Sequence, residues 1–387
     1  MVVMQFEFAT ATRILFGPGK LKEIDSIAAN LGKRALIVQG GNSARSLPLR
    51  SILGEAGIEF STFEIRGEPT NEDIIHGVRK ARESDFDLII GFGGGSVIDS
   101  AKAIAAVAAN PGELSDYQET IGGGKPILAP ALASIAIPTT AGTGAEVTRN
   151  AVLASRQLRV KASLRSPHLL PRVALVDPEL TYGLPPSLTA STGLDALTQL
   201  IEPFVSIRSN PLTDALCLEG IRRAARSLQR AYDKGSDPDA RRDMALASLF
   251  GGLALANSGL GAVHGFAAPI GGMFSAPHGA VCAALLPHVM EINTHALRLR
   301  GSNGDSLNRY VKIAAIVTES EKADVEEGIA WVRDLCQKLK IPGLRAYGIQ
   351  EKDVTTIVGH AIKASSMKAN PIALTNEELT ESLTRAL

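Results

Sequence analysis

The first half of the chain alternates short apolar runs with longer segments in which apolar residues recur at helical spacing. The apolar runs, each typical of a buried strand, occupy 34–41, 58–65, 87–95 and 133–140. Helical spacing fills 46–57, 71–85 and 96–110 between them. Because strands and helices alternate, the pattern predicts right-handed βαβ units around a mainly parallel sheet, with further strands in 161–180.

The second half of the chain follows a helical pattern. Proline and glycine are concentrated in 178–187, where the strand pattern ends. Long segments with helical spacing follow at 190–206, 210–233, 240–257 and 326–340. We therefore predict two domains, an α/β domain over 1–183 and an all-helical domain over 184–387.

Composition and charge exclude several classes of protein. The 387 residues are enough for about two domains, and 45% hydrophobic and 21% charged residues are typical of globular chains. Forty basic residues balance forty acidic ones, so we expect no binding to nucleic acid or to an anionic membrane. Glu7 interrupts what a signal peptide would need, and the most apolar stretch, 127–138, is broken by prolines. We therefore expect a soluble, cytoplasmic protein.

The cysteines and most histidines carry no obvious chemistry. Cys217, Cys282 and Cys336 are widely spaced and form no CxxC pair, which suggests neither a disulfide framework nor a thiolate zinc site. We expect them to be buried, apolar thiols. Five histidines are interpreted as hydrogen-bonded core residues rather than ligands: His76, His168, His288, His295 and His360.

A glycine-rich turn after the strand at 87–95 is a candidate phosphate-binding site. The turn opens the next helix with Gly94, Gly95 and Ser96, and a helix N-terminus attracts anions. Ser96 stands where the GxGxxG dinucleotide fingerprint has its last glycine, so the turn departs from that motif. The alternative is that these glycines serve only tight packing.

Two other loops follow predicted strands, at the edge where open α/β sheets bind ligands. The loop 138–148 carries Thr139, Thr140 and Thr143, whose hydroxyl groups are suited to ribose and phosphate; alternatively they form a turn that caps the next helix. The loop after the first strand, which contains Gly40, has no carboxylate to repel a 2′-phosphate. We therefore expect either NAD or NADP to be accepted.

Four polar residues in the helical half resemble the wall of a metal pocket. Asp195 and Gln199 are spaced i and i+4 and share one face of a helix. His264 and His278 bracket a segment that Pro269, Gly271, Gly272 and Pro277 are predicted to bend. A carboxamide is a weak metal ligand, so the sequence leaves open whether Gln199 binds the metal. Alternatively, His264 acts as a general acid–base without metal.

The long motifs resemble those of the iron-containing (group III) alcohol dehydrogenase family. They run in family order over nearly the whole chain: GGGSVIDSAKA, IPTTAGTGAEVT, VDPEL, STGLDAL, the HG-to-PHG spacing and LLPHVM. The resemblance implies a dehydroquinate synthase-like fold, with a nucleotide-binding α/β domain and an all-helical domain. It also implies Fe²⁺, or Zn²⁺, in the cleft between them, NAD or NADP as cofactor, and a homodimer.

The resemblance assigns roles by position. It implies that Asp195, His264 and His278 bind metal, with Gln199 where the family has a histidine as its fourth ligand. It places Asp99 with Gly94, Gly95 and Ser96 at the phosphates, and Thr139, Thr140 and Thr143 on the second cofactor loop. It places Pro69 and Thr70 on the adenosine side. Lys161 falls where the family has a lysine near the cofactor, with an exposed surface lysine as the alternative.

Two residues depart from the family pattern. Gln199 replaces a histidine ligand, and Ala268 replaces a histidine credited with relaying protons. Our first hypothesis is therefore an NAD(P)-dependent oxidoreductase that interconverts a small alcohol with its aldehyde or ketone, aided by a divalent metal. The alternatives are a reductase of a polar carbonyl substrate, similar to maleylacetate reductases, and a catalytically weak nucleotide-binding relative.

Overall fold

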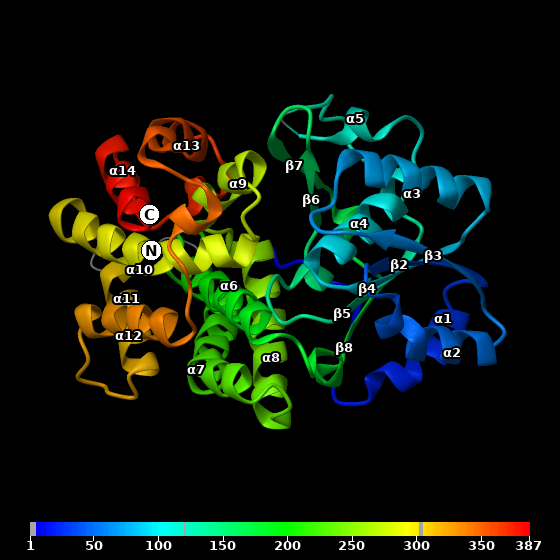
Figure 1. The fold of residues 1–387 in the computed structure, drawn as a ribbon, viewed down its shortest axis with the longest axis horizontal. Helices are drawn as coiled ribbons and strands as arrows, with labels where there is room; N and C mark the ends of the chain where they lie inside the picture. The colour runs from blue at the N-terminus through cyan, green and yellow to red at the C-terminus, as the bar shows by residue number, and fades with distance from the viewer. Residues whose placement is uncertain (1–4, 120, 302–304) are drawn as a thin grey trace. The chain divides into compact units, whose positions relative to one another are not determined.

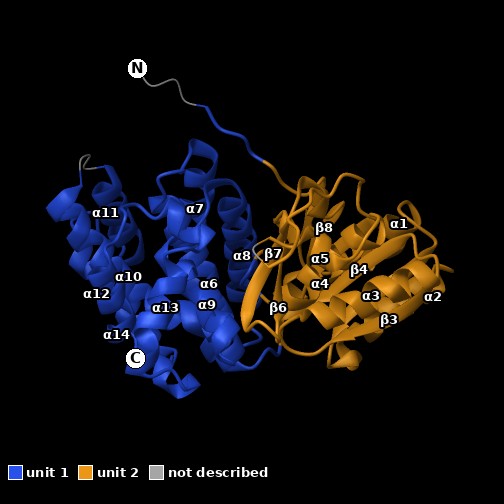
Figure 2. Cartoon of the chain, turned by 90° about the horizontal axis from the view of Figure 1, so that it is seen from above, with its two compact units in different colours: residues 1–8, 141–143, 183–387 blue, residues 9–140, 144–182 orange. Residues whose placement is uncertain are grey.

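The computed structural model describes residues 5–119, 121–301 and 305–387, which form two compact units. Of the described residues, the first unit contains 9–140 and 144–182, and the second contains 5–8, 141–143 and 183–387 (Figure 2). The first is built around a sheet and the second is helical, which confirms the predicted fold class.

The main sheet has six strands in the order β1-β8-β5-β4-β2-β3. Its strands are β1 (Arg13–Phe16), β2 (Arg34–Gly40), β3 (Glu59–Ile65), β4 (Leu88–Gly93), β5 (Ala133–Pro138) and β8 (Val173–Val176). Every neighbouring pair is parallel, as predicted. An antiparallel pair, β6 (Asn150–Ser155) and β7 (Val160–Arg165), forms a separate two-stranded sheet.

Helices cover both faces of the main sheet (Figure 1). These helices are α1 (Ile24–Ala29), α2 (Leu47–Glu55), α3 (Asn71–Glu83), α4 (Gly95–Ala108) and the short α5 (Leu114–Tyr117). Leu36 and Val38 of β2 belong to one core with residues of α3 and α4, whereas Ala35 and Ile37 belong to another with residues of α1 and α2. Successive side chains of a strand point to opposite faces, so a continuous apolar strand supplies both cores.

The second unit consists of nine α-helices within its described residues, packed around one large core. They are α6 (Pro186–Val205), α7 (Pro211–Asp233), α8 (Pro238–Ser258), α9 (Ala262–Met273), α10 (His278–Arg300), α11 (Asp305–Val317), α12 (Val325–Lys338), α13 (Val354–Ala361) and α14 (Asn376–Arg385). No single described helix is both long and apolar enough to cross a membrane; α8 and α9 pass that test only when counted together, across a 98° bend.

The bend predicted between His264 and His278 lies only at the end of that segment. Helix α9 runs through Pro269, Gly271 and Gly272 and ends at Met273. Burial of Val263 and Phe266 on this helix offsets the one hydrogen bond that a proline cannot donate. The chain turns only at 274–277.

The five histidines expected in the core are not buried. His76, His295 and His360 are exposed on α3, α10 and α13, and His168 and His288 are half-buried. The imidazoles of the three exposed histidines remain in contact with solvent. Their distance from the core leaves His264 as the buried histidine of the described chain.

Candidate metal centre and cofactor-binding turns

Helix α6 places two buried oxygen acceptors on one face. Asp195 and Gln199 lie one turn apart and are 1% and 2% exposed. Asp195 Oδ1 and Gln199 Oε1 accept no hydrogen bond from any described residue. Because buried polar atoms are nearly always paired, these two unpaired oxygens indicate a missing partner such as a cation.

His264 is held in place by Glu202, another residue of α6. The Nδ1 atom of His264 lies 2.6 Å from Glu202 Oε2, and the Val263 amide donates to Glu202 Oε1 at 2.7 Å. The Ala262 amide donates to Asn370 Oδ1 at 3.0 Å, so two side chains satisfy the first amides of α9. Since a carboxylate accepts at Nδ1, the Nε2 lone pair of His264 is left for a metal.

His278 begins α10, and the glycine after it lets this helix approach α6. A Cβ atom on Gly279 would lie 2.4 Å from the Ser191 carbonyl oxygen and 3.3 Å from the Asp195 Cβ. The first turn of α10 therefore packs directly against the turn of α6 that carries Asp195. This close approach brings the His278 imidazole to the carboxylate.

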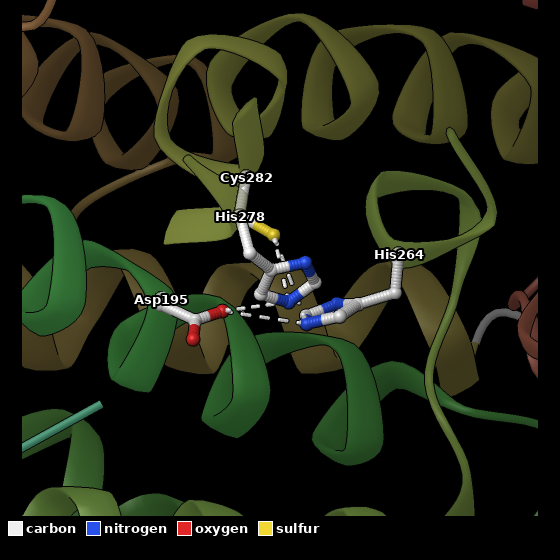
Figure 3. Close-up of side chains that lie close together, drawn as sticks. All are labelled: Asp195, His264, His278 and Cys282. Atoms are coloured by element: carbon white, nitrogen blue, oxygen red, sulfur yellow. Dashed lines mark hydrogen bonds and ion pairs between the residues drawn. The ribbon is translucent and has the colours of Figure 1, made fainter. Parts of the chain in front are cut away.

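The three donors fit a divalent metal. Asp195 Oδ1 lies 3.4 Å from Nε2 of His264 and 3.6 Å from Nε2 of His278, at ion-pair rather than hydrogen-bond geometry (Figure 3). Zinc–nitrogen and zinc–oxygen bonds of about 2.0–2.2 Å at tetrahedral angles require an oxygen–nitrogen separation of about 3.4 Å. The structure thus brings together three of the four predicted metal residues, and Gln199 shares the face of α6 with Asp195.

A fourth donor in this group, Cys282, was missed by the sequence reasoning. Its Sγ lies 3.7 Å from Nε2 of His278 and 3.8 Å from Nε2 of His264. One ligand atom from each of the four residues lies within 4.8 Å of all the others. The expectation of an apolar thiol is therefore wrong for Cys282. The available signal was its i, i+4 spacing from His278 on one helix, rather than a CxxC pair.

The four groups shift one another's pKa values. Burial raises the pKa of Asp195 and Cys282, but the two facing imidazoles outweigh burial and lower both. Burial lowers the pKa of His264 and His278, but the charges around them, chiefly that of Cys282, outweigh burial and raise both. These shifts favour protonated imidazoles in the metal-free group, and a metal that binds competes with those protons.

The other two cysteines behave as the sequence suggested. Burial raises the pKa of Cys336 to about 12 and that of Cys217 well above its usual value. The Cys336 thiol donates only to the Ala283 carbonyl oxygen, at 3.5 Å. Both are buried, and neither belongs to a metal-binding group among the described residues.

The glycine-rich turn of the sheet unit combines packing with an open helix N-terminus. A Cβ atom on Gly91 would lie 2.9 Å from Ala101, and one on Gly93 would lie 2.6 Å from Val97, so these glycines let β4 pack closely against α4. Gly94 is the N-cap residue of α4, and no side chain caps this helix. Gly94, Gly95 and Ser96 therefore form a turn suited to a phosphate group.

The second loop lies beside that turn. The Thr139 amide donates to the Gly93 carbonyl oxygen at 2.9 Å, and a Cβ atom on Gly94 would lie 3.3 Å from Thr140 Oγ1. Thr143 belongs to the helical unit. The remaining predicted cofactor residues occupy two other strand ends: Gly40 ends β2, while Pro69 and Thr70 precede α3, which Thr70 caps.

Two predicted site residues are held in ion pairs. Asp99 Oδ1 lies 2.9 Å from the buried Lys102 Nζ, and its Oδ2 accepts from the Val152 amide at 3.0 Å. Lys161 Nζ lies 2.9 Å from Glu68 Oε2. The contact with cofactor stays a prediction for both residues.

Comparison with known proteins gives one consistent family. The family model described as iron-containing alcohol dehydrogenase matches residues 11–178, and the C-terminal model of the Fe-containing alcohol dehydrogenase family matches 189–387. Alcohol dehydrogenase 4 of Saccharomyces cerevisiae (strain YJM789) is 35% identical over 377 residues, 96% of each chain. The 1,3-propanediol dehydrogenase of Klebsiella pneumoniae is 33% identical, again over 96% of each chain.

Solved structures agree with this result. A crystal structure of 1,3-propanediol oxidoreductase is similar at a TM-score of 0.92 and 33% identity, covering 99% of this chain and 100% of the other. Sulfoacetaldehyde reductase from Bifidobacterium kashiwanohense, solved with NAD⁺, is similar at a TM-score of 0.86 and 28% identity, covering 99% of each chain.

Proposed function

The chain belongs to the iron-containing alcohol dehydrogenase family, and from that premise we propose that it interconverts a small primary alcohol and its aldehyde with NAD or NADP at a site whose metal is held by Asp195, His264 and His278. It is an alcohol dehydrogenase of the iron-containing type, and the resemblance seen in the sequence is confirmed. We propose which residues bind the metal and the cofactor, and which class of substrate reacts.

One observation carries the proposal: a carboxylate oxygen and two imidazole nitrogens converge with no hydrogen bond to the oxygen. Fe²⁺ or Zn²⁺ bound there would act as a Lewis acid that polarises the substrate oxygen. Glu202 holds the Nδ1 proton of His264 so that Nε2 faces the group. Burial of Asp195 and His264 excludes water and strengthens their electrostatic effect.

The cofactor assignments rest on the sheet unit. Gly94, Gly95 and Ser96 would receive the pyrophosphate at the N-terminus of α4, with Thr139, Thr140 and Thr143 on the ribose and phosphates. Gly40, Pro69 and Thr70 would line the adenosine side, with Asp99 nearby. A catalytic role for Lys161 requires it to leave the ion pair with Glu68.

A small primary alcohol is favoured by the relatives. They include 1,3-propanediol dehydrogenases, a 4-hydroxybutyrate dehydrogenase from Cupriavidus necator and an NAD-dependent methanol dehydrogenase from Bacillus methanolicus. The NADPH-dependent butanol dehydrogenase of Clostridium saccharobutylicum supports testing both cofactors. Ala268 cannot relay a proton, so we propose that solvent does so for this chain.

The test combines metal analysis with turnover. Protein purified without chelator should contain a divalent metal and should oxidise NADH or NADPH in the presence of a panel of small aldehydes. Asp195→Asn removes the anionic donor and should lower kcat by at least about 10-fold, whereas the exposed Asp334→Asn should not. Absence of turnover with added Fe²⁺ and with added Zn²⁺ would reject the proposal.

We also propose that the enzyme is a cytoplasmic homodimer. The family resemblance supports this assignment. Sedimentation equilibrium of the purified chain measures the assembly, and cell fractionation measures the location. A monomer at micromolar concentration would contradict the proposed homodimer.

A further inference from the structure

We propose that the thiolate of Cys282 is the fourth protein ligand of the metal, taking the place of the imidazole that position 199 lacks. The inference rests on the proposed metal-dependent function and goes further, because it changes the donor set. Asp195, His264 and His278 supply one oxygen and two nitrogens, and Cys282 would add sulfur.

The distances match those of a zinc-type site with sulfur. A zinc–sulfur bond of about 2.3 Å and zinc–nitrogen bonds of about 2.0–2.1 Å at tetrahedral angles require a sulfur–nitrogen separation of about 3.6 Å. Cys282 Sγ lies 3.7 Å and 3.8 Å from the Nε2 atoms of His278 and His264. Both of these nitrogens also face Asp195 Oδ1 at 3.4–3.6 Å, so the four donor atoms surround one point (Figure 3).

The position of Cys282 in α10 explains how sulfur reaches this point. His278 and Cys282 are one helical turn apart, so their side chains project from the same face of α10. The close approach of α10 to α6 at Gly279 then sets both side chains against Asp195. Cys282 is fully buried, and its Sγ makes polar contacts with the two histidine nitrogens.

Gln199 is the competing fourth ligand. It lies one turn from Asp195, and its unpaired Oε1 is an acceptor. A neutral carboxamide oxygen is a weaker ligand than a thiolate for zinc or cobalt. We assign Gln199 to hydrogen bonding with a molecule in the pocket rather than to the metal.

Cobalt substitution of the purified full-length protein tests the proposal. Wild-type protein loaded with Co²⁺ should show a sulfur-to-cobalt charge-transfer band in the near ultraviolet, and X-ray absorption of the Zn²⁺ form should show one sulfur at about 2.3 Å. Cys282→Ser should abolish the band and weaken Zn²⁺ binding by at least about 10-fold. Cys336→Ser, which alters another buried thiol, and Gln199→Ala should both retain the band.

A rescue variant separates a lost ligand from a damaged fold. Gln199→His added to Cys282→Ser places an imidazole one turn after Asp195, and it should restore Zn²⁺ affinity without restoring the band. In the wild-type background the same substitution should change affinity much less, since the fourth position is already filled.

The outcomes separate this inference from the proposed function. Metal that binds the wild type without a sulfur scatterer overturns the role of Cys282 and leaves the metal-dependent function standing. No metal bound to the wild type overturns both. If Cys282→Ser fails to fold by circular dichroism, the sulfur count in the wild-type absorption spectrum decides the question.

Discussion

Glu202 contacts two parts of the proposed metal centre with its two carboxylate oxygens. One oxygen fixes the Nδ1 side of the His264 imidazole, and the other accepts the Val263 amide at the start of α9. The orientation of the ligand and the end of the helix that carries it therefore depend on one buried carboxylate. Such partners of metal ligands strongly influence affinity.

Replacing this carboxylate by an amide should weaken metal binding. Glu202→Gln keeps the size of the side chain but turns an NH₂ group toward either the His264 nitrogen or the Val263 amide, both of which need an acceptor. We expect Zn²⁺ affinity to fall about 10- to 100-fold, measured by competition with a chelating dye. Glu219→Gln on α7, where the carboxylate forms exposed ion pairs, is the control and should bind as the wild type does. Equal affinities for all three proteins would show that Glu202 does not orient the ligand.

At this scale the sequence predicted part of the group that the fold brings together. Asp195, His264 and His278 were found because of their type, spacing and family motif. Glu202 and Cys282 were missed because their roles arise where α6, α9 and α10 meet, which no local pattern encodes. The residues next to Cys282 in the sequence are apolar, and they gave no indication that two imidazoles face its thiol in the folded chain.

At the scale of elements, the packing of α10 against α6 determines whether the donors meet. The two helices meet at Gly279, where an added Cβ atom would collide with a backbone oxygen that cannot rotate away. The backbone conformation itself is unstrained there, so the requirement is for space alone. A methyl group introduced at Gly279 tests this requirement for space.

Gly279→Ala should separate the two helices. Its new methyl group would meet the Ser191 carbonyl oxygen, so we expect a cost of about 1–3 kcal/mol in the free energy of unfolding and a lower metal occupancy. Gly359→Ala on α13 is matched to it, because a Cβ there meets nothing within 4 Å. Urea unfolding and metal analysis of both variants give the comparison. Unchanged metal content in Gly279→Ala would mean that the close helix approach is not needed for the centre.

The elements themselves were largely predictable, but their neighbours were not. Strands β2, β4 and β5 follow nearly continuous apolar runs, as expected for inner strands of a sheet that is covered on both faces. Strand β3 lies at the edge of the sheet, and most of its residues are half-buried or exposed. The pairing of β1 with β8 joins residues about 160 positions apart, as in Arg13 with Val173, and no local signal specifies it. The bend predicted around Pro269, Gly271 and Gly272 falls instead at 274–277, because tertiary burial outweighs proline and glycine propensity within α9.

For the whole molecule, balanced charge makes individual buried groups decide how stability depends on pH. Forty basic and forty acidic residues leave little net repulsion near neutral pH. Glu146 stands out in the sheet unit because burial raises its pKa to about 7, although the charge of Lys102 partly opposes the effect. Lys102 Nζ is itself engaged by Asp99 at 2.9 Å and by Thr148 Oγ1 at 2.8 Å.

Glu146 should therefore destabilise the folded protein as pH rises. Its pKa is about 7 when folded against 4.5 for the free side chain, so the folded state binds more protons between these values. The stability that this group contributes is fully present below about pH 4.5 and lost as pH rises through 7, a change of about 3 kcal/mol. Urea unfolding at pH 5 and pH 8 should show a smaller loss of stability for Glu146→Gln than for the wild type.

Comparing the stability that the wild type and Glu146→Gln lose between pH 5 and pH 8 isolates the contribution of this one carboxyl group. Any constant cost of placing an amide in the buried site cancels in the difference between the two pH values, and titration of the metal centre is common to both proteins. The exposed Glu83→Gln on α3 is the control and should follow the wild-type curve. If Glu146→Gln lost as much stability between pH 5 and pH 8 as the wild type, the buried carboxyl would already be ionised at pH 5, held so by Lys102 more strongly than its burial opposes.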